Sequence, residues 1–209
     1  GSYSNPRRAI TAPLASRQDD RIVAAHDAAV KAAVTYVEEN MVSTRRQNSA
    51  GEMEVVEGGK IIAGLFRHDT SRSLDPQLHT HAVIANMVLN PDGKWSSLRN
   101  DDIFKGKMLA GEIYRSELAA NLRELGYTVE RRGKDAIPEI VGVSSKLLDT
   151  FSKRSAAIDA ALERRGLEDT PENRALAALV TREAKSGNLN RERWPQAGFA
   201  DIEPCGTRH

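Results

Sequence analysis

The sequence predicts an α+β domain in which helices pack on an antiparallel β-sheet built mainly from residues 52–143. Two segments rich in Ile, Val and Leu, 60–68 and 78–89, are typical of strands. The polar loop 69–77 between them is short enough for the two strands to pair antiparallel. Segments whose apolar residues recur at helical spacing stand before, within and after this strand region.

The first half of the chain predicts one helix followed by strands. The helix covers 23–41, where apolar residues recur at helical spacing with alanines between them. A short edge strand is expected at 53–56, and Gly58-Gly59 closes it as a turn. Strands 60–68 and 78–89 carry apolar residues at both odd and even positions, so we expect both of their faces to be covered.

The middle of the chain predicts a third strand and a long helix. Asn90-Pro91-Asp92-Gly93 is a strong turn signal, and residues 94–98 are expected to continue the same meander. Asn100 is a good N-cap for a helix that runs to Leu125, with acidic residues in the first turn where the helix dipole favours them. Gly126 ends this helix as a C-cap glycine.

A hairpin and two further helices are predicted for the remainder. Residues 127–130 are expected to pair with a strand at 137–143. Apolar spacing predicts a helix over 144–166. Thr170 before Pro171 supplies an N-cap and a first-turn proline for another helix.

Charge and composition exclude several classes of protein. The 209 residues include 30 Lys and Arg and 29 Asp and Glu, a formal net charge of +1, so a histone-like wrapper is excluded and a nucleic-acid footprint must be local. The single cysteine, Cys205, excludes an intramolecular disulfide and a cysteine-rich metal site, and fits a reducing compartment. We expect a cytoplasmic protein, because no apolar run reaches the roughly 20 residues of a membrane helix and no signal peptide is recognisable.

The chain is expected to consist of one domain with less ordered ends. Residues 1–21 are expected to be a poorly anchored N-terminal segment, 22–200 the folded domain, and 201–209 a tail. The opening Gly1-Ser2 resembles a scar left by tag removal, so we expect the natural start upstream.

Three of the five histidines fall where they can converge. His79 and His81 are separated by one residue in a predicted strand, so their side chains project from the same face. His68 ends the preceding strand, and antiparallel pairing brings it beside them. Three neutral imidazoles make an open site for Mn, Fe, Ni, Cu or Zn, with positions left for water or substrate. The alternative for the His-x-His pair is a set of local hydrogen bonds, and His26, without a predicted partner, is expected to be an ordinary helix residue.

Two sequence blocks are specific enough to identify a family. They are Phe66-Arg67-His68-Asp69-Thr70-Ser71-Arg72 and Asp75-Pro76-Gln77-Leu78-His79-Thr80-His81-Ala82-Val83. These blocks resemble the metal-binding segment of conjugative relaxases of the TrwC type, the MobF class of HUH endonucleases. The similarity includes residues 25–30, 92–95, 114, 125–127 and 151–154 and extends over about residues 20–200. The resemblance implies that residues 22–200 are a relaxase-like metal- and DNA-binding domain of a bacterial protein.

The resemblance implies a palm-like antiparallel sheet on which His68, His79 and His81 hold one divalent metal ion, with Mg or Mn first and Zn, Ni or Cu as alternatives. The ion would hold the scissile phosphate of single-stranded or hairpin DNA at an origin of transfer. A tyrosine near the N-terminus attacks phosphorus, which gives a 5′-phosphotyrosyl enzyme and a free 3′-hydroxyl. Accessory relaxosome proteins, a coupling ATPase and a C-terminal helicase domain in the full-length protein are also implied.

The N-terminal segment departs from the family's pattern. In the family the nucleophilic tyrosines stand well ahead of the first helix, and a strand between them carries an aspartate that supports the metal site. Here Tyr3 is the only tyrosine near the start, and residues 10–16 are a partial match to that strand without its aspartate. Tyr3 is therefore the candidate nucleophile, and a truncated, nicking-deficient form of the relaxase domain is the interpretation if Tyr3 does not attack. The alternative is a non-catalytic, metal-containing DNA-binding module with the relaxase fold.

Basic residues near the histidines are candidate DNA contacts, with a solvated surface role as the alternative for each. They are Arg67, Arg72, Arg99, Lys105, Lys107, Lys153 and Arg154. Trp95 and Trp194 could stack on bases, but burial in the core is the expected role. Two other enzyme classes that use His-x-His, cupins and TIM-barrel amidohydrolases, are excluded by the long predicted helices and by the length of the chain.

Overall fold

The structure is a computed structural model that describes residues 20–70, 76–132, 137–143 and 153–181. The chain divides into two compact units. One, the sheet unit, comprises residues 24–67 and 80–124; the second unit comprises the described parts of 1–23, 68–79 and 125–209. The predicted segment 1–21 and the tail 201–209 lie almost wholly outside the described residues, so these domain limits stay predictions. No helix in the described ranges is long and apolar enough to cross a membrane.

Two three-stranded sheets carry the histidine region. The first has the order β3-β4-β5, with β3 at Lys60–Thr70, β4 at Pro76–Leu89 and β5 at Trp95–Ser96. The second has the order β2-β1-β6, with β1 at Ser43–Gln47, β2 at Met53–Glu57 and β6 at Leu98–Arg99. The long strands confirm the prediction. The expected third strand is shared between the sheets, because Trp95 pairs with Leu89 whereas Leu98 pairs with Thr44.

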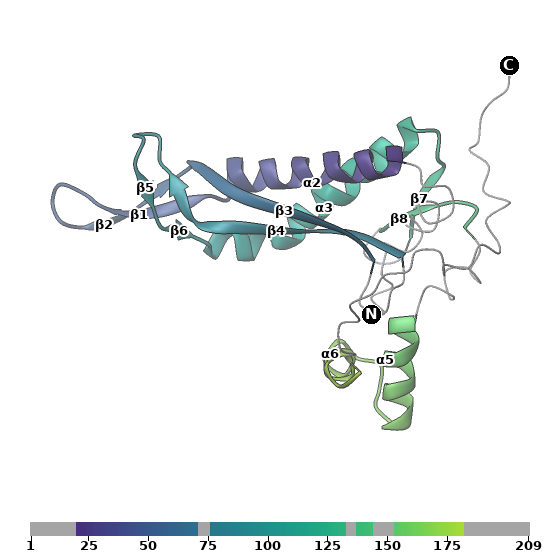
Figure 1. The fold of residues 1–209 in the computed structure, drawn as a ribbon. Coiled ribbons are helices and arrows are strands. Elements are labelled where there is room, and N and C mark those ends of the chain that lie inside the picture. The colour runs from purple at the N-terminus through teal and green to yellow at the C-terminus, as the bar shows by residue number, and fades with distance from the viewer. Residues whose placement is uncertain (1–19, 71–75, 133–136, 144–152, 182–209) are drawn as a thin grey trace, which may run out of the picture. The chain divides into compact units, whose positions relative to one another are not determined.

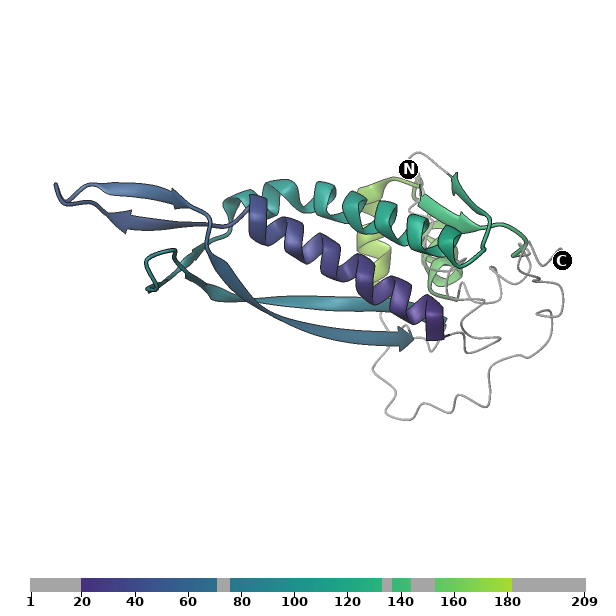
Figure 2. The same cartoon turned by 90° about the horizontal axis from the view of Figure 1, so that it is seen from above.

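The hairpin β1–β2 contains a strand that the sequence did not predict. Its register places Ser43 opposite Glu57, and the strands pair antiparallel. Asn48 closes the turn, because its side-chain oxygen accepts hydrogen bonds from the backbone N–H groups of Ala50 and Glu52 at 3.0 and 2.9 Å. Both views show the hairpin projecting past the helices of the sheet unit (Figures 1 and 2).

Two long helices, α2 at Asp20–Asn40 and α3 at Asp101–Glu124, confirm the predicted helices. They lie side by side, as Figure 2 shows. On α2 the buried residues include Ala25 and Ala29, whose small side chains allow a close approach. The buried residues of α3 are Leu118, Ala119 and Leu122. The side-chain amide of Asn121 donates to the carbonyl oxygen of Ala25 at 3.3 Å, which ties the two helices together.

The expectation that both faces of the long strands are covered is wrong. Ile62 and Phe66 on β3 are 51% and 57% exposed, and Val83 on β4 is 57% exposed. Trp95, expected in the core, is 52% exposed. The helices of the sheet unit lie on one side of β3 and β4 (Figure 2), so alternate side chains of these strands face away from them. In these strands, apolar residues at both odd and even positions therefore do not mean that both faces of the sheet are buried.

The second unit contains a separate hairpin. β7 at Val129–Arg132 and β8 at Ile137–Ile140 pair antiparallel, with Val129 opposite Ile140. The predicted pairing is confirmed, but the single sheet expected over 52–143 is wrong, because the strands in the described part of the chain form three sheets. Alternation of apolar and polar residues along a strand does not identify the strand with which it pairs.

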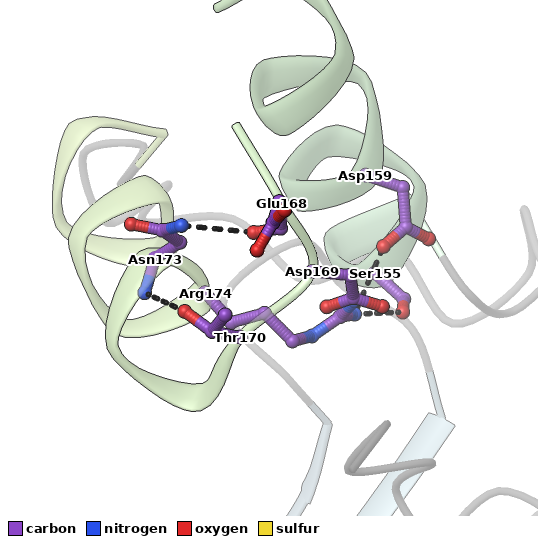
Figure 3. A network of polar contacts seen from close by, with 7 residues as sticks. All are labelled: Ser155, Asp159, Glu168, Asp169, Thr170, Asn173 and Arg174. Atoms are coloured by element: carbon purple, nitrogen blue, oxygen red, sulfur yellow. Dashed lines mark hydrogen bonds and ion pairs between the residues drawn. The ribbon is translucent and has the colours of Figure 1, made fainter. Parts of the chain in front are cut away.

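Two short helices complete the second unit. α5 spans Lys153–Arg164 and α6 spans Pro171–Val180, and they pack through Ala161, Leu162 and Ala177. Thr170 is the N-cap of α6, as predicted, since its hydroxyl accepts from the N–H of Asn173 at 3.2 Å. Arg174 joins the two helices through ion pairs with Asp159 and Asp169 (Figure 3). The part of the predicted helix at 144–152 lies outside the described residues.

Candidate metal and DNA site

Two of the three predicted ligands lie together. His68 stands near the end of β3 and His79 near the start of β4, and these strands are hydrogen-bonded neighbours. The two imidazole rings lie 5.3 Å apart between centroids, with their planes inclined by 24°. Two imidazoles bound to one ion through nitrogens at about 2.1 Å have ring centres about 5 Å apart. The spacing of His68 and His79 therefore fits a shared ion.

The tautomer of His79 is set by its own strand. Its Nδ1 lies 2.8 Å from the carbonyl oxygen of Gln77. A carbonyl only accepts, so Nδ1 carries the hydrogen and donates it. In the neutral ring the lone pair then belongs to Nε2. Histidine ligands of metals usually donate their other ring N–H to a carbonyl or carboxylate, so the local arrangement of His79 fits a ligand that binds through Nε2.

The third predicted ligand, His81, follows two residues later in β4 and is exposed. Residues two apart in a strand project from the same face, so His79 and His81 share a face of β4. Within the described ranges no group of three or more His, Cys, Asp and Glu side chains is arranged as a metal site. The donor chemistry fits a divalent ion, whereas the convergence of His68, His79 and His81 stays a prediction.

The expectation that His26 is an ordinary residue without a partner is wrong. His26 is 2% exposed. Its Nδ1 lies 2.8 Å from the hydroxyl oxygen of Tyr114 on α3, and its Nε2 lies 2.8 Å from Oγ1 of Thr80 on β4. The partners are 88 and 54 residues away, so no local pattern in the sequence could reveal them. Thr80 is the residue between His79 and His81.

The described basic candidates are mostly paired with carboxylates. Arg67 forms an ion pair with Asp27 on α2. Arg99 donates to Asp101 at 2.7 Å, and this hydrogen bond lowers the pKa of the Asp101 carboxyl. Lys105 lies 3.7 Å from Asp102, and Lys107 is exposed on α3. The remaining candidates lie outside the described residues or have undescribed side chains: Tyr3, Arg72, Lys153, Arg154 and Trp194.

Comparisons with known proteins agree on one family. The family described as TrwC relaxase matches residues 3–198. The multifunctional conjugation protein TraI of Escherichia coli is 41% identical over 176 residues, which are 80% of this chain and 10% of TraI. A metal-bound structure of the conjugative relaxase TrwC with oriT DNA has a TM-score of 0.82 at 34% identity, covering 88% of this chain and 64% of that one. TrwC complexed with a 27-mer DNA comprising the recognition hairpin and the cleavage site has a TM-score of 0.81 at 35% identity, covering 89% and 66%.

The chain thus spans one tenth of the curated relative and about two thirds of the solved TrwC chains. The family match covers most of the sequence, and the structural similarity extends to the same α+β arrangement of antiparallel sheets and helices. The chain belongs to the TrwC relaxase family.

Proposed function

We propose that this chain is the relaxase domain of a conjugative DNA-transfer protein, which nicks and rejoins single-stranded DNA at an origin of transfer. One observation carries the proposal: in a TrwC-family chain, the rings of His68 and His79 lie 5.3 Å apart on neighbouring strands, and His81 follows in β4. One solved relative is a complex with oriT DNA and another is a complex with a 27-mer DNA that comprises a recognition hairpin and a cleavage site, which supports the same class of substrate here.

His68, His79 and His81 would hold one divalent ion. One solved TrwC complex is described as metal-bound and another as copper-bound, which supports a metal without fixing its identity. Imidazole nitrogens bind Mn, Ni, Cu and Zn, with the highest intrinsic affinity for Cu. Because this order is the same for most sites, the ion bound in the cell also depends on which metals are available. When bound, the ion would supply positive charge beside the scissile phosphate and leave open positions for its oxygens.

The residues of the chain itself supply orientation and contacts. The bond from His79 Nδ1 to the Gln77 carbonyl holds that ring with Nε2 as its lone-pair nitrogen. The basic candidates would contact backbone phosphates, which position a strand without reading its sequence. They are Arg67, Arg72, Arg99, Lys105, Lys107, Lys153 and Arg154.

Tyr3 is the proposed nucleophile. Its hydroxyl would lose its proton and its oxygen would form a bond to phosphorus while the bond from phosphorus to the 3′ oxygen breaks. The 3′ oxygen takes up one proton, so the step is balanced. The reverse reaction rejoins the strand. TraI is described as multifunctional, which supports a larger parent protein, and we propose a helicase domain, accessory relaxosome proteins and a coupling ATPase as partners of that parent.

A covalent-adduct assay tests the proposal. The chain is incubated with Mn²⁺ and a 3′-labelled 27-mer that contains a recognition hairpin and a cleavage site, because the fragment 3′ of the nick stays on the protein. A labelled band that survives denaturation is expected for the wild type and for His209→Ala, which removes a histidine that is not a predicted ligand. The band should disappear in Tyr3→Phe and fall at least tenfold in His81→Ala.

The same assay separates the alternatives. Tight binding of the 27-mer without any adduct would identify either a nicking-deficient relaxase domain or a non-catalytic, metal-containing DNA-binding module. An adduct that persists in Tyr3→Phe would mean that another residue is the nucleophile. If the chain neither binds the 27-mer nor forms an adduct with it, the proposed function is contradicted.

A further inference from the structure

His26 joins three elements of the sheet unit. It stands on α2, is 2% exposed, and has both ring nitrogens 2.8 Å from hydroxyl oxygens, those of Tyr114 on α3 and Thr80 on β4. Its ring also meets that of Tyr114 edge-on, with centroids 5.5 Å apart. Burial of an imidazole costs free energy unless its nitrogens are hydrogen-bonded, so both contacts are needed to keep the ring inside.

The partner on β4 is the residue between two predicted metal ligands. Adjacent side chains in a strand project to opposite faces, so Thr80 faces α2 while His79 and His81 project from the other face. The hydroxyl of residue 80 is attached to Cβ, two bonds from the strand backbone, so a buried hydrogen bond to it restrains the position of the backbone. The hydrogen bond from His26 to Thr80 therefore restrains β4 on the face opposite the two histidines, at the residue that stands between them.

The neighbours of His26 on α2 make similar ties. The carbonyl oxygen of Ala25 accepts from Asn121 of α3 at 3.3 Å. Asp27 pairs with Arg67, the residue immediately before His68. The Asp27–Arg67 pair is half exposed on both sides and contributes little by itself, whereas the His26 bond is buried. Three consecutive residues of α2 thus contact α3 and both histidine-bearing strands.

We propose that His26, acting through Thr80, is a positioning residue that holds His79 and His81 ready for the divalent ion. The proposal rests on the proposed function, since it presumes that these histidines bind metal. A ligand segment held on a helix loses less conformational freedom when the ion binds, which raises affinity. Removal of a group that is hydrogen-bonded to a metal ligand typically weakens metal affinity by about 10- to 100-fold. Because Thr80 is the neighbour of two predicted ligands and not their hydrogen-bond partner, we expect its removal to weaken the affinity by about three- to tenfold.

The test is the Mn²⁺ affinity of matched Thr80 variants, followed by the electron paramagnetic resonance signal of free Mn²⁺. Thr80→Val removes the hydroxyl and keeps the branched shape, and should weaken binding about three- to tenfold. Thr80→Ser keeps the hydroxyl, and its affinity should stay within about twofold of the wild type. Tyr114→Phe removes the hydroxyl on the other side of His26, far from β4 in the sequence, and should weaken binding in the same direction by a smaller factor. Melting temperatures of all variants are measured in parallel.

Each outcome decides the question. A lower affinity in Thr80→Val that Thr80→Ser restores supports the positioning role. A wild-type Mn²⁺ affinity in Thr80→Val overturns the positioning role, and so does a loss of affinity in Thr80→Ser that equals the loss in Thr80→Val. If His81→Ala abolishes binding in the same experiment, the three-histidine site itself is still supported. If Thr80→Val does not fold, a wild-type affinity in Tyr114→Phe overturns the proposal. No Mn²⁺ binding by the wild type overturns both the metal site and this inference.

Discussion

The imidazole Nδ1 of His79 donates a hydrogen bond to the carbonyl oxygen of Gln77, two residues earlier in β4, at 2.8 Å. The bond predicts that His79 binds metal through Nε2 and holds the Nδ1–H tautomer before and after loading. Nitrogen-15 shifts of the ring, measured with and without Zn²⁺ as a diamagnetic probe, report the tautomer directly. An Nε2–H ring in the loaded protein would contradict the prediction.

A tight backbone approach at Gly59 predicts a strong effect of a single methyl group. Gly59 has a φ of +119°, and a Cβ there would lie 2.3 Å from Cγ1 of Val88 and 3.0 Å from the carbonyl oxygen of Leu89. We expect Gly59→Ala to lower the free energy of unfolding by about 2–3 kcal/mol, from backbone strain and overpacking together.

Gly58 provides the matched control. It also has a positive φ, +86°, but a Cβ there would meet nothing within 4 Å. Gly58→Ala should therefore lose only about 1 kcal/mol, the cost of the left-handed conformation. Urea unfolding of both variants measures the difference, and equal losses would show that β3 and β4 are not packed closely at this point.

The ion pair between Glu38 on α2 and Lys60 on β3 predicts a pH dependence of stability. The ammonium of Lys60 lies 2.6 Å from the Glu38 carboxylate, and this hydrogen bond lowers the pKa of Glu38 below its ordinary value of 4.5. Because the folded pKa is the lower one, the stabilisation is fully present above about pH 4.5 and is lost as the pH falls through the folded pKa.

Melting temperatures of the wild type and Glu38→Gln should therefore differ at neutral pH and converge in acid. We expect a difference of about 1–2 °C at pH 7, since the pair is partly exposed and screened. Glu39→Gln, at the neighbouring exposed carboxylate, is the control. A difference that grows as the pH falls below 4.5 would contradict the assigned sign.

Arg174 links α5 and α6 in a way that lysine cannot reproduce. Its two terminal nitrogens each lie 2.9 Å from a carboxylate oxygen, one on Asp159 and one on Asp169 (Figure 3), and its side chain is 14% exposed. The hydrogen bond with Asp169 raises the pKa of the guanidinium. Arg174→Lys keeps the positive charge but cannot contact both carboxylates through two terminal nitrogens. We therefore expect the free energy of unfolding to fall by about 1–2 kcal/mol.

Hydrogen exchange of the α5 and α6 amides measures this loss locally. The control is Arg164→Lys, at an exposed position near the end of α5. The two variants should differ clearly in protection, and the same small change in both would mean that the bridge contributes nothing.

The sequence predicted those elements whose signals are local. The Ile- and Val-rich strands, the N-cap Thr170 and the glycine after α3 each depend on a few neighbouring residues, and the structure agrees. β1 was missed because Ser43–Gln47 is a polar run whose strand state depends on pairing with β2 and β6. Local propensity carries no information about that pairing.

Errors at the candidate site have the same origin. His26 gave no signal because its partners are Thr80 and Tyr114, more than fifty residues away. Trp95 was assigned to the core by the size and apolar character of its side chain alone, whereas it is 52% exposed. The proximity of His68 and His79 was predicted correctly, because a short loop between adjacent strands limits where the second strand can lie, whereas their role as metal ligands stays a prediction.

The most direct test of the central claim is the amount of metal bound per chain. After manganese loading and desalting, elemental mass spectrometry is applied to the wild type, His68→Ala, His81→Ala and the control His209→Ala. A site made by His68, His79 and His81 predicts close to one equivalent in the wild type and the control, and near zero in the two ligand variants. One equivalent that persists in His68→Ala and His81→Ala, or no manganese in any of the four proteins, would contradict the three-histidine site.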